Sequence, residues 1–324
     1  MTEHIPRIYG LHRLPAEAER RLAGRFAIDW NTDDRDLPPE QLVELSTQYD
    51  GLVTTVTDRL PESVFAARGR RIRVVANFGV GVNLIDLAAA RRQRVVVTNT
   101  PDVLTDCTAD LTLALILMAF RRLGEGERLI RSGGWLGWRP THHLGHRMSG
   151  RTLGIVGMGR IGLAVARRAR HGFGMDIRYT SRSPLSADLV AELGAVRLDL
   201  DDLFRDADVV SLHCPATPET EGMVDRRRLG LMRPDAVLIN TARGGLVDEL
   251  AVADAIQRGR LGGAGFDVYR DEPAVAPALL ALDRVVLLPH LGSATVETRT
   301  AMGLTVTENL EAFFSGREPP NRVA

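Results

Sequence analysis

Three polar side chains in the second half of the chain, Arg243, Glu272 and His290, are of the types that carbonyl reduction requires. An arginine can present a planar fork to a carboxylate or a carbonyl group. A histidine can donate a proton to a forming alkoxide, and a glutamate beside it can orient the ring and stabilise its charged form. Each lies at or just beyond an apolar stretch that we interpret as a strand, where ligands of open α/β sheets bind. Together they predict a site for a 2-oxo acid, provided that a hydride donor binds to the same sheet.

Each of these residues also has an ordinary structural explanation. Arg243 could form a surface ion pair, Glu272 could be a turn residue before a proline, and His290 could be packed in a core. A histidine considered alone is more often structural than catalytic. The hypothesis therefore depends on whether the rest of the sequence supplies a cofactor.

A glycine-rich segment is the first sign of a cofactor. The apolar run 152–156 is typical of a short buried strand, Gly157-x-Gly159-x-x-Gly162 follows at once, and 161–169 has apolar residues at helical spacing. Strand, glycine turn and helix in this order form the dinucleotide fingerprint. The glycines allow a tight turn, close approach of the pyrophosphate and close packing of helix on strand, and the helix N-terminus attracts the phosphates. The alternative is a tight turn that binds no ligand.

The end of the next strand indicates which dinucleotide binds. Residues 176–179 predict that strand, and an NAD-selective site would place Asp or Glu directly after it, to bind the ribose 2′-OH. Ser181, Arg182 and Ser183 stand there instead, and arginine pairs well with a 2′-phosphate. We therefore expect NADPH as the cofactor, with NADH bound more weakly. The alternative is that Arg182 is a solvated surface charge.

Composition excludes several other classes of protein. The chain has 324 residues and a formal net charge of +0, so it has no excess of positive charge that would attract nucleic acid or anionic lipid. Its most apolar run, 111–120, is too short to cross a bilayer. Cys107 and Cys214 are far apart and form no CxxC pair. We expect a cytoplasmic protein with no nucleic-acid and no membrane partner.

One histidine cluster invites a metal interpretation. His142, His143 and His146 lie in a segment rich in Gly, Trp, His and Arg. They have no carboxylate or cysteine partner there, so we expect solvated or interfacial side chains and no metal site.

The apolar runs predict two consecutive α/β units without internal repeats. A long helix over 106–123 is expected to end at Gly124, a helix and a connecting arm follow over 124–150, and a final helix over 294–315 is expected to end at the prolines 319–320. Strands are predicted at 7–10, 51–56, 72–77, 95–99, 152–156, 176–180, 208–212, 236–240, 263–268 and 285–288. Helices between the first of these strands are predicted at 15–24, 39–47, 61–69 and 84–92.

Several motifs together make the chain resemble a known family. They are residues 76–83, 98–106 and 151–162, with the segments around Arg243, Glu272 and His290. Over essentially its full length the chain resembles the D-isomer-specific 2-hydroxyacid dehydrogenases, and within them the glyoxylate/hydroxypyruvate (2-ketogluconate) reductases.

The resemblance implies roles for individual residues. Arg243 binds the substrate, Glu272 and His290 form the proton-donating pair, and Asp267 holds the nicotinamide carboxamide. Further cofactor contacts are expected from Thr108, Met158, Arg160, Ile161, Cys214, Pro215, Thr241 and Ala242. Further substrate contacts are expected from Val56, Trp138 and the backbone N–H groups of the Val80-Gly81 loop.

The resemblance also implies an architecture. A Rossmann-type doubly wound parallel sheet domain, residues 101–290 with an arm at 122–150, is inserted into a flavodoxin-like α/β substrate domain formed by 1–100 and 291–324. The active site is then the cleft between the domains. Family members are usually homodimers, in which a tryptophan of the arm can reach the partner's site; Trp138 is the preferred candidate and Trp135 the second.

The predicted function is reduction of a small 2-oxo acid, such as glyoxylate, hydroxypyruvate or 2-ketogluconate, to the D-2-hydroxy acid with hydride from NADPH. One alternative is another D-2-hydroxyacid dehydrogenase, of the D-lactate or D-3-phosphoglycerate type. A different class is a dinucleotide-sensing corepressor, which shares the fold and acts by binding protein partners.

Overall fold

The computed structural model describes residues 5–324 of the chain, which form two compact units. The first unit contains the residues up to 104 together with 294–324, and the second contains 105–293. The assignment of the first unit to the substrate and of the second to the cofactor stays a prediction.

The first unit is built on a five-stranded parallel sheet with the order β2-β1-β3-β4-β5. Chain order and sheet order differ only at the first two strands, which is the flavodoxin-like arrangement. Its strands are β1 (Arg7–Gly10), β2 (Ala27–Trp30), β3 (Gly51–Thr55), β4 (Val74–Phe78) and β5 (Val96–Thr98).

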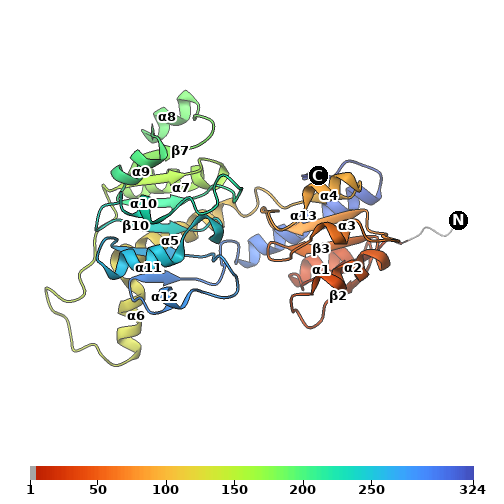
Figure 1. Ribbon diagram of the computed structural model, residues 1–324, viewed down its shortest axis with the longest axis horizontal. Helices are drawn as coiled ribbons and strands as arrows, with labels where there is room; N and C mark the ends of the chain where they lie inside the picture. The colour runs from red at the N-terminus through yellow and green to blue at the C-terminus, as the bar shows by residue number, and fades with distance from the viewer. Residues whose placement is uncertain (1–4) are drawn as a thin grey trace. The chain divides into compact units, whose positions relative to one another are not determined.

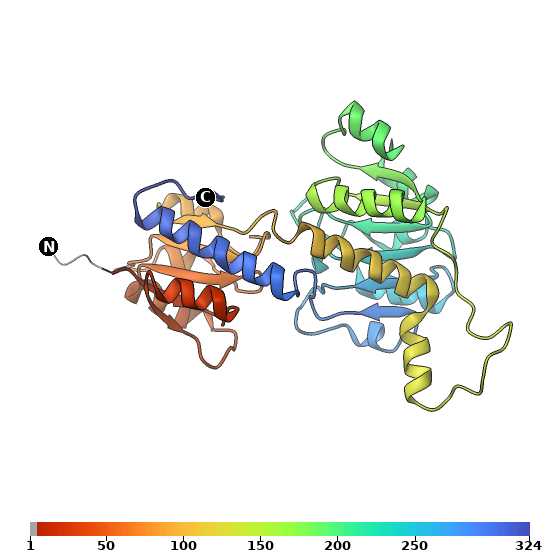
Figure 2. The same ribbon diagram turned by 180° about the vertical axis from the view of Figure 1, so that it is seen from behind.

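Helices cover both faces of this sheet, because alternate strand residues point to opposite sides and both sides are apolar. Val53 and Val74 face α1 and α13, whereas Leu52 and Val75 face α2, α3 and α4. Figure 2 shows α13 and α1 side by side across the first of these faces. The helices are α1 (Ala16–Ala23), α2 (Pro39–Gln48), α3 (Glu62–Phe65), α4 (Leu87–Arg92) and α13 (Val296–Phe314).

The second unit is built on a seven-stranded parallel sheet with the order β12-β11-β10-β9-β6-β7-β8. The chain starts at β6, adds β7 and β8 on one side, and then returns to add β9 to β12 on the other. The point where the direction reverses, between β6 and β9, is where open α/β sheets bind ligands. The strands are β6 (Thr152–Val156), β7 (Asp176–Thr180), β8 (Val196–Arg197), β9 (Val209–Leu212), β10 (Val237–Asn240), β11 (Gly263–Phe266) and β12 (Val285–Leu287).

Two apolar cores enclose this sheet, one on each face. Helices α5 (Thr105–Arg121) and α7 (Arg160–Phe173) pack against each other over one face, as Figure 2 shows. Helices α9, α10 and α11 lie over the opposite face, in front of the sheet in Figure 1. The remaining elements are α6 (Leu123–Arg131), α8 (Ala187–Leu193), α9 (Leu200–Asp206), α10 (Arg226–Leu229), the 3₁₀ turn η1 (Gly244–Leu246), α11 (Glu249–Gln257) and α12 (Pro277–Leu280).

One predicted helix end was wrong, and a second helix ends about where it was predicted but at a different stop signal. Helix α5 ends at Arg121 because Arg122 has a left-handed φ of 54°, and Gly124, predicted to end it, lies inside α6. Helix α13 ends at Phe314, with Gly316 at a φ of 77° two residues beyond, so glycine rather than the prolines at 319–320 ends it.

Candidate active site

The glycine turn joins β6 to α7 with a geometry that only glycine permits. Gly157 has a φ of 98°, and a Cβ there would lie 2.7 Å from the backbone nitrogen of Cys214. A Cβ on Gly162 would lie 2.2 Å from the carbonyl oxygen of Gly157, so α7 starts directly against the turn. Space lies open around Gly159, and no side chain caps α7 there. The first-turn N–H groups of α7 therefore have no side-chain cap, and the space beside Gly159 is open, as a phosphate site at a helix N-terminus requires.

The predicted residues around this turn differ in exposure. Met158 and Ile161 pack partly against the core, and Arg160 is exposed. On the adjacent strand end after β9, Cys214 is half-buried with its thiol 3.7 Å from the sulfur of Met223, and burial raises the pKa of this thiol to about 11. Cys214 is therefore a neutral packing residue at this edge, and Pro215 after it is exposed.

The loop after β7 contains no carboxylate and is braced by a second arginine. The Ser181 hydroxyl donates to the carbonyl of Ser183 at 2.6 Å. The Arg197 guanidinium donates to the carbonyls of Ser181 at 2.8 Å and Arg182 at 3.3 Å. The side chain of Arg182 is exposed. The loop is thus held in place with two cations beside it and no acid to accept from a ribose 2′-OH, a composition that suits a 2′-phosphate.

His290 and Glu272 form a hydrogen-bonded pair. Nδ1 of His290 lies 2.8 Å from Oε2 of Glu272, and the Tyr269 N–H donates to Oε1 of the same carboxylate at 2.8 Å. His290 lies three residues beyond the end of β12 and has a φ of 54°, a left-handed conformation that a non-glycine residue adopts only when its surroundings impose it. A carboxylate accepts only, so Nδ1 carries the proton of this bond and Nε2 is the nitrogen left for other chemistry.

Charge keeps Glu272 ionised. Burial raises the pKa of Glu272, but the hydrogen bond and charge of His290, the Tyr269 N–H and the charge of Arg243 outweigh burial and hold the pKa below its usual range. The Glu272 carboxylate is therefore an anion beside the His290 ring.

Arg243 is held close to this pair by the loop after β10. Asn240, fully buried, accepts from the Ala242 N–H at 3.0 Å and donates to the Arg243 carbonyl at 2.9 Å. The next residue, Gly244, lies against the backbone of Tyr269 so closely that any Cβ would collide with it. Burial lowers the pKa of Arg243 and the charge of Glu272 raises it, but a guanidinium stays protonated in either case. A positive charge therefore lies near the His290–Glu272 pair.

Asp267 and Thr108 brace the segment that carries His290. The two oxygens of buried Asp267 accept from the N–H groups of Leu291 at 2.6 Å and Gly292 at 2.7 Å. The Thr108 hydroxyl donates to the Gly292 carbonyl at 3.0 Å. Thr241, also predicted to contact the cofactor, is buried at 3.0 Å from the hydroxyl of Thr112 on α5. The predicted cofactor contacts of these residues stay predictions.

The residues predicted in the first unit lie after β3 and β4. Val56 packs over Gly79, and the side-chain amide of buried Asn77 donates to the carbonyls of Gly79 at 3.1 Å and Gly81 at 3.0 Å. Asn77 therefore fixes the loop whose N–H groups at Val80 and Gly81 were predicted to bind a carboxylate. Asn77 and Asn240 were not predicted as site residues, although both are asparagines at the end of an apolar strand, which is the signal that could have identified them.

The arm after α6 exposes apolar side chains. Trp138 is 78% exposed, Trp135 51% and Leu136 86%, and no residue of α6 is buried. Of the three arm histidines, His143 lies 2.9 Å from the Arg122 carbonyl and His146 lies 3.5 Å from the Arg151 guanidinium. Over residues 5–324, no helix is long and apolar enough to cross a membrane.

Comparisons with known proteins agree with this architecture. Residues 113–292 match the family model described as D-isomer specific 2-hydroxyacid dehydrogenase, NAD binding domain. The chain is 42% identical to the glyoxylate reductase of Pyrococcus furiosus, covering 98% of this chain and 95% of that one. It is 44% identical to the glyoxylate reductase of Thermococcus kodakarensis, covering 98% and 96%.

One similar solved structure contains a bound cofactor. The NADPH-dependent glyoxylate/hydroxypyruvate reductase of Sinorhizobium meliloti, in complex with NADP and malonate, superposes with a TM-score of 0.87 at 37% identity, covering 99% of this chain and 97% of that one.

Proposed function

Because the chain belongs to the D-isomer-specific 2-hydroxyacid dehydrogenases, and is thus an oxidoreductase that binds a nicotinamide cofactor, we propose that it reduces glyoxylate or hydroxypyruvate with NADPH. 2-Ketogluconate is a further substrate to test. The observation that carries the proposal is the 2.8 Å pair of His290 and Glu272 on the same sheet edge as the glycine turn and the acid-free loop after β7. A bound reduced nicotinamide supplies the hydride.

Substrate binding and proton donation are assigned to side chains of the protein. Arg243 donates to the carboxylate and the carbonyl oxygen of the 2-oxo acid, which orients the carbonyl and draws electron density from its carbon. His290 donates the Nε2 proton to the oxygen as it becomes an alkoxide. Glu272 keeps the ring in position and stabilises its protonated form before the transfer. Val56, Val80 and Gly81 are proposed to bind the substrate from the first unit.

The cofactor preference rests on the loop after β7. Arg182 is proposed to pair with the 2′-phosphate, while Ser181 and Ser183 offer hydroxyl groups to it. The solved structure of the Sinorhizobium meliloti enzyme contains NADP, and that enzyme is named as NADPH-dependent. NADH lacks the 2′-phosphate and is expected to bind more weakly.

We also propose that the chain forms a homodimer through α6 and the arm. Large apolar side chains exposed over this region are Leu123, Ile130, Trp135, Leu136, Trp138 and Leu144. Exposed apolar patches of this kind mark protein interfaces. Trp138 is proposed to line the substrate pocket of the partner.

A steady-state panel tests the proposed function. Glyoxylate, hydroxypyruvate, pyruvate and 2-ketogluconate are each assayed with NADPH and with NADH. The proposal predicts the highest kcat/KM for glyoxylate or hydroxypyruvate with NADPH. A clear preference for pyruvate, or for NADH, would replace it with another dehydrogenase activity, and no turnover with any acid would favour a dinucleotide-sensing binding protein.

A further inference from the structure

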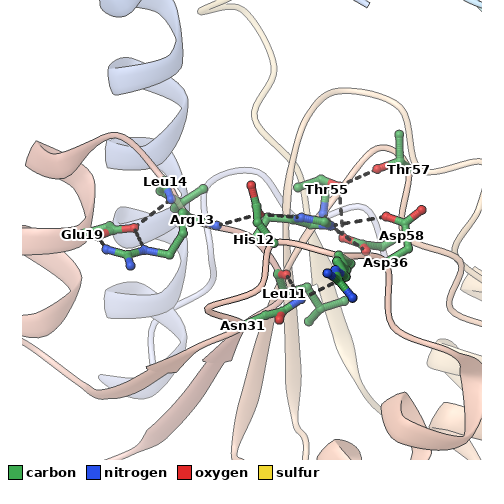
Figure 3. A network of polar contacts seen from close by, with 12 residues as sticks. Leu11, His12, Arg13, Leu14, Glu19, Asn31, Asp36, Thr55, Thr57 and Asp58 are labelled. Carbon is green, nitrogen blue, oxygen red and sulfur yellow. Dashed lines mark hydrogen bonds and ion pairs between the residues drawn. The ribbon is translucent and has the colours of Figure 1, made fainter. Parts of the chain in front are cut away.

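Outside the candidate active site, the first unit gathers one histidine and three aspartates at the carboxyl edge of its sheet. His12 follows β1, Asp58 follows β3, and Asp34 and Asp36 lie in the segment between β2 and α2. Figure 3 shows His12, Asp36 and Asp58 converging above the ends of the strands. Nothing in the proposed reduction uses these side chains.

Both ring nitrogens of His12 face carboxylate oxygens. Nδ1 lies 3.0 Å from Oδ1 of Asp34, and Nε2 lies 3.2 Å from Oδ1 of Asp58 and 3.9 Å from Oδ1 of Asp36. A neutral imidazole has one N–H and one lone pair, and a carboxylate can only accept. With Nδ1–H donating to Asp34, the lone pair of Nε2 would face two further acceptors. In this tautomer a cation, either a second proton or a metal ion, is needed at Nε2 to meet these oxygens.

The charges around His12 favour a cation with more than one positive charge. Within residues 5–324, the ion pairs of Asp34, Asp36 and Asp58 are all with His12. Counting His12 and the three aspartates alone, an imidazolium would leave a net charge of −2, whereas a neutral ring with a divalent ion would leave −1.

The ligand atoms are already oriented. Oδ2 of buried Asp58 accepts from the Thr55 N–H at 2.6 Å and the Thr55 hydroxyl at 3.0 Å, which leaves Oδ1 directed at His12. Asp34 holds Nδ1 as carboxylates do in carboxylate–histidine–metal arrangements. A tetrahedral zinc ion with bonds of about 2.1 Å separates its ligand atoms by roughly 3.4 Å. The Nε2–oxygen separations of 3.2 and 3.9 Å lie on either side of that spacing.

We propose that Nε2 of His12, Oδ1 of Asp36 and Oδ1 of Asp58 bind a divalent transition-metal ion, with zinc fitting this donor set well and Asp34 orienting the ring. This departs from the expectation, drawn from the sequence, that the chain has no metal site. The side chain of Asp36 is 74% exposed, so water from the solvent completes the coordination of the ion. The ion would tie the end of β1, the β2–α2 segment and the turn after β3 together. That turn carries Val56.

Zinc titration of the chelator-treated full-length chain by calorimetry tests the site. The expected result is one zinc ion per chain, bound with release of a proton. No stoichiometric binding by the wild-type chain would overturn the proposal.

Variants locate the site. His12→Gln and Asp36→Asn should each weaken zinc binding at least about tenfold, and Asp34→Asn by about 10–100-fold through loss of ring orientation. Asp36 is exposed, so its variant tests the site without disturbing a core. The matched control replaces His142, His143 and His146 by asparagine and should bind zinc as the wild type does. Binding that survives His12→Gln and Asp36→Asn, or is lost in the arm control, would contradict the assignment. Because this measurement needs neither NADPH nor a 2-oxo acid, its outcome is independent of the proposed reduction.

Discussion

His290 has one ring nitrogen to offer a substrate because Glu272 occupies the other. Their 2.8 Å contact fixes which nitrogen donates, and the lowered pKa of Glu272 keeps the carboxylate charged at neutral pH. Arg243 adds a fixed positive charge nearby. At the scale of single residues, the proposed chemistry thus needs one group that donates a proton, Nε2 of His290. It also needs two neighbouring groups that stay charged, Glu272 and Arg243.

Glu272→Gln tests the role of that negative charge. Glu272 is ionised above its lowered pKa, so at neutral pH the anion stabilises protonated His290, and the neutral amide no longer does so. The high-pH limb of kcat/KM for glyoxylate reduction should therefore move to lower pH. Glu249→Gln is the control, because Glu249 accepts from the Arg270 N–H and not from His290. An unshifted limb with intact NADPH binding would show that Glu272 does not tune the proton donor.

Arg182→Ala tests the cofactor preference. Loss of a charge-assisted contact to the 2′-phosphate should weaken NADPH binding by about 1.5–3 kcal/mol and leave NADH binding nearly unchanged. Dissociation constants measured by cofactor fluorescence give the comparison. Arg167→Ala is the control, since Arg167 lies on α7 and pairs with Glu192. Equal losses for both cofactors would remove the basis for NADPH selectivity.

At the scale of elements, two glycines of one turn have separable roles. A Cβ on Gly162 meets the backbone of Gly157, whereas a Cβ on Gly159 meets nothing in the free protein. Gly162→Ala should therefore lower the free energy of unfolding by about 1–3 kcal/mol. Gly159→Ala should leave stability unchanged and weaken NADPH binding by at least about tenfold, because the methyl group occupies the space of the pyrophosphate.

Gly172→Ala in the last turn of α7 is the control for both variants. Nothing lies near its Cβ position, so alanine should be neutral or stabilise the helix by up to about 1 kcal/mol. Thermal unfolding and NADPH titration of the three variants separate the two roles. Unchanged cofactor affinity in Gly159→Ala would mean that no phosphate approaches this turn.

The elements that the sequence predicts best are those with strong apolar patterns. The strand 152–156 is buried from its second residue on, because a parallel strand covered on both faces is continuously apolar, and α7 buries one face of the helix predicted after it. Strands β2 and β8 were missed, because both lie at sheet edges and expose half or all of their residues. The end of α5 was misplaced, because the left-handed residue there is Arg122, and arginine carries no sequence signal for that conformation.

Individual site residues were easier to name from the sequence than their surroundings. Arg243, Glu272 and His290 stand out by type, and the structure brings them to one sheet edge. The bracing by Asn77 and Asn240 depends on hydrogen bonds to loop carbonyls, which no spacing rule predicts. The cluster around His12 was also missed, because Asp34 and Asp58 come from segments 24 residues apart that meet only through the sheet order β2-β1-β3.

At the scale of the whole molecule, Trp138 gives a test of the proposed dimer. If Trp138 completes the partner's pocket, Trp138→Ala and His290→Ala homodimers should each be poorly active. In a mixed dimer, the site with an intact His290 receives an intact Trp138 from the partner. Mixing the two variants under conditions of subunit exchange should therefore restore activity toward half that of the wild type in each mixed dimer. No recovery, or a wild-type chain that sediments as a fully active monomer, would contradict the role of Trp138.

The central claim, that His290 delivers the proton when a 2-oxo acid is reduced, is tested most directly by His290→Ala. Glyoxylate-dependent NADPH oxidation and NADPH affinity are measured on the same preparation of the variant. Our account predicts that kcat falls by about two to four decades while the dissociation constant of NADPH stays within about twofold of the wild type, because only the proton donor is lost. A variant that turns over glyoxylate at close to the wild-type rate would contradict the assignment of His290 as the proton donor.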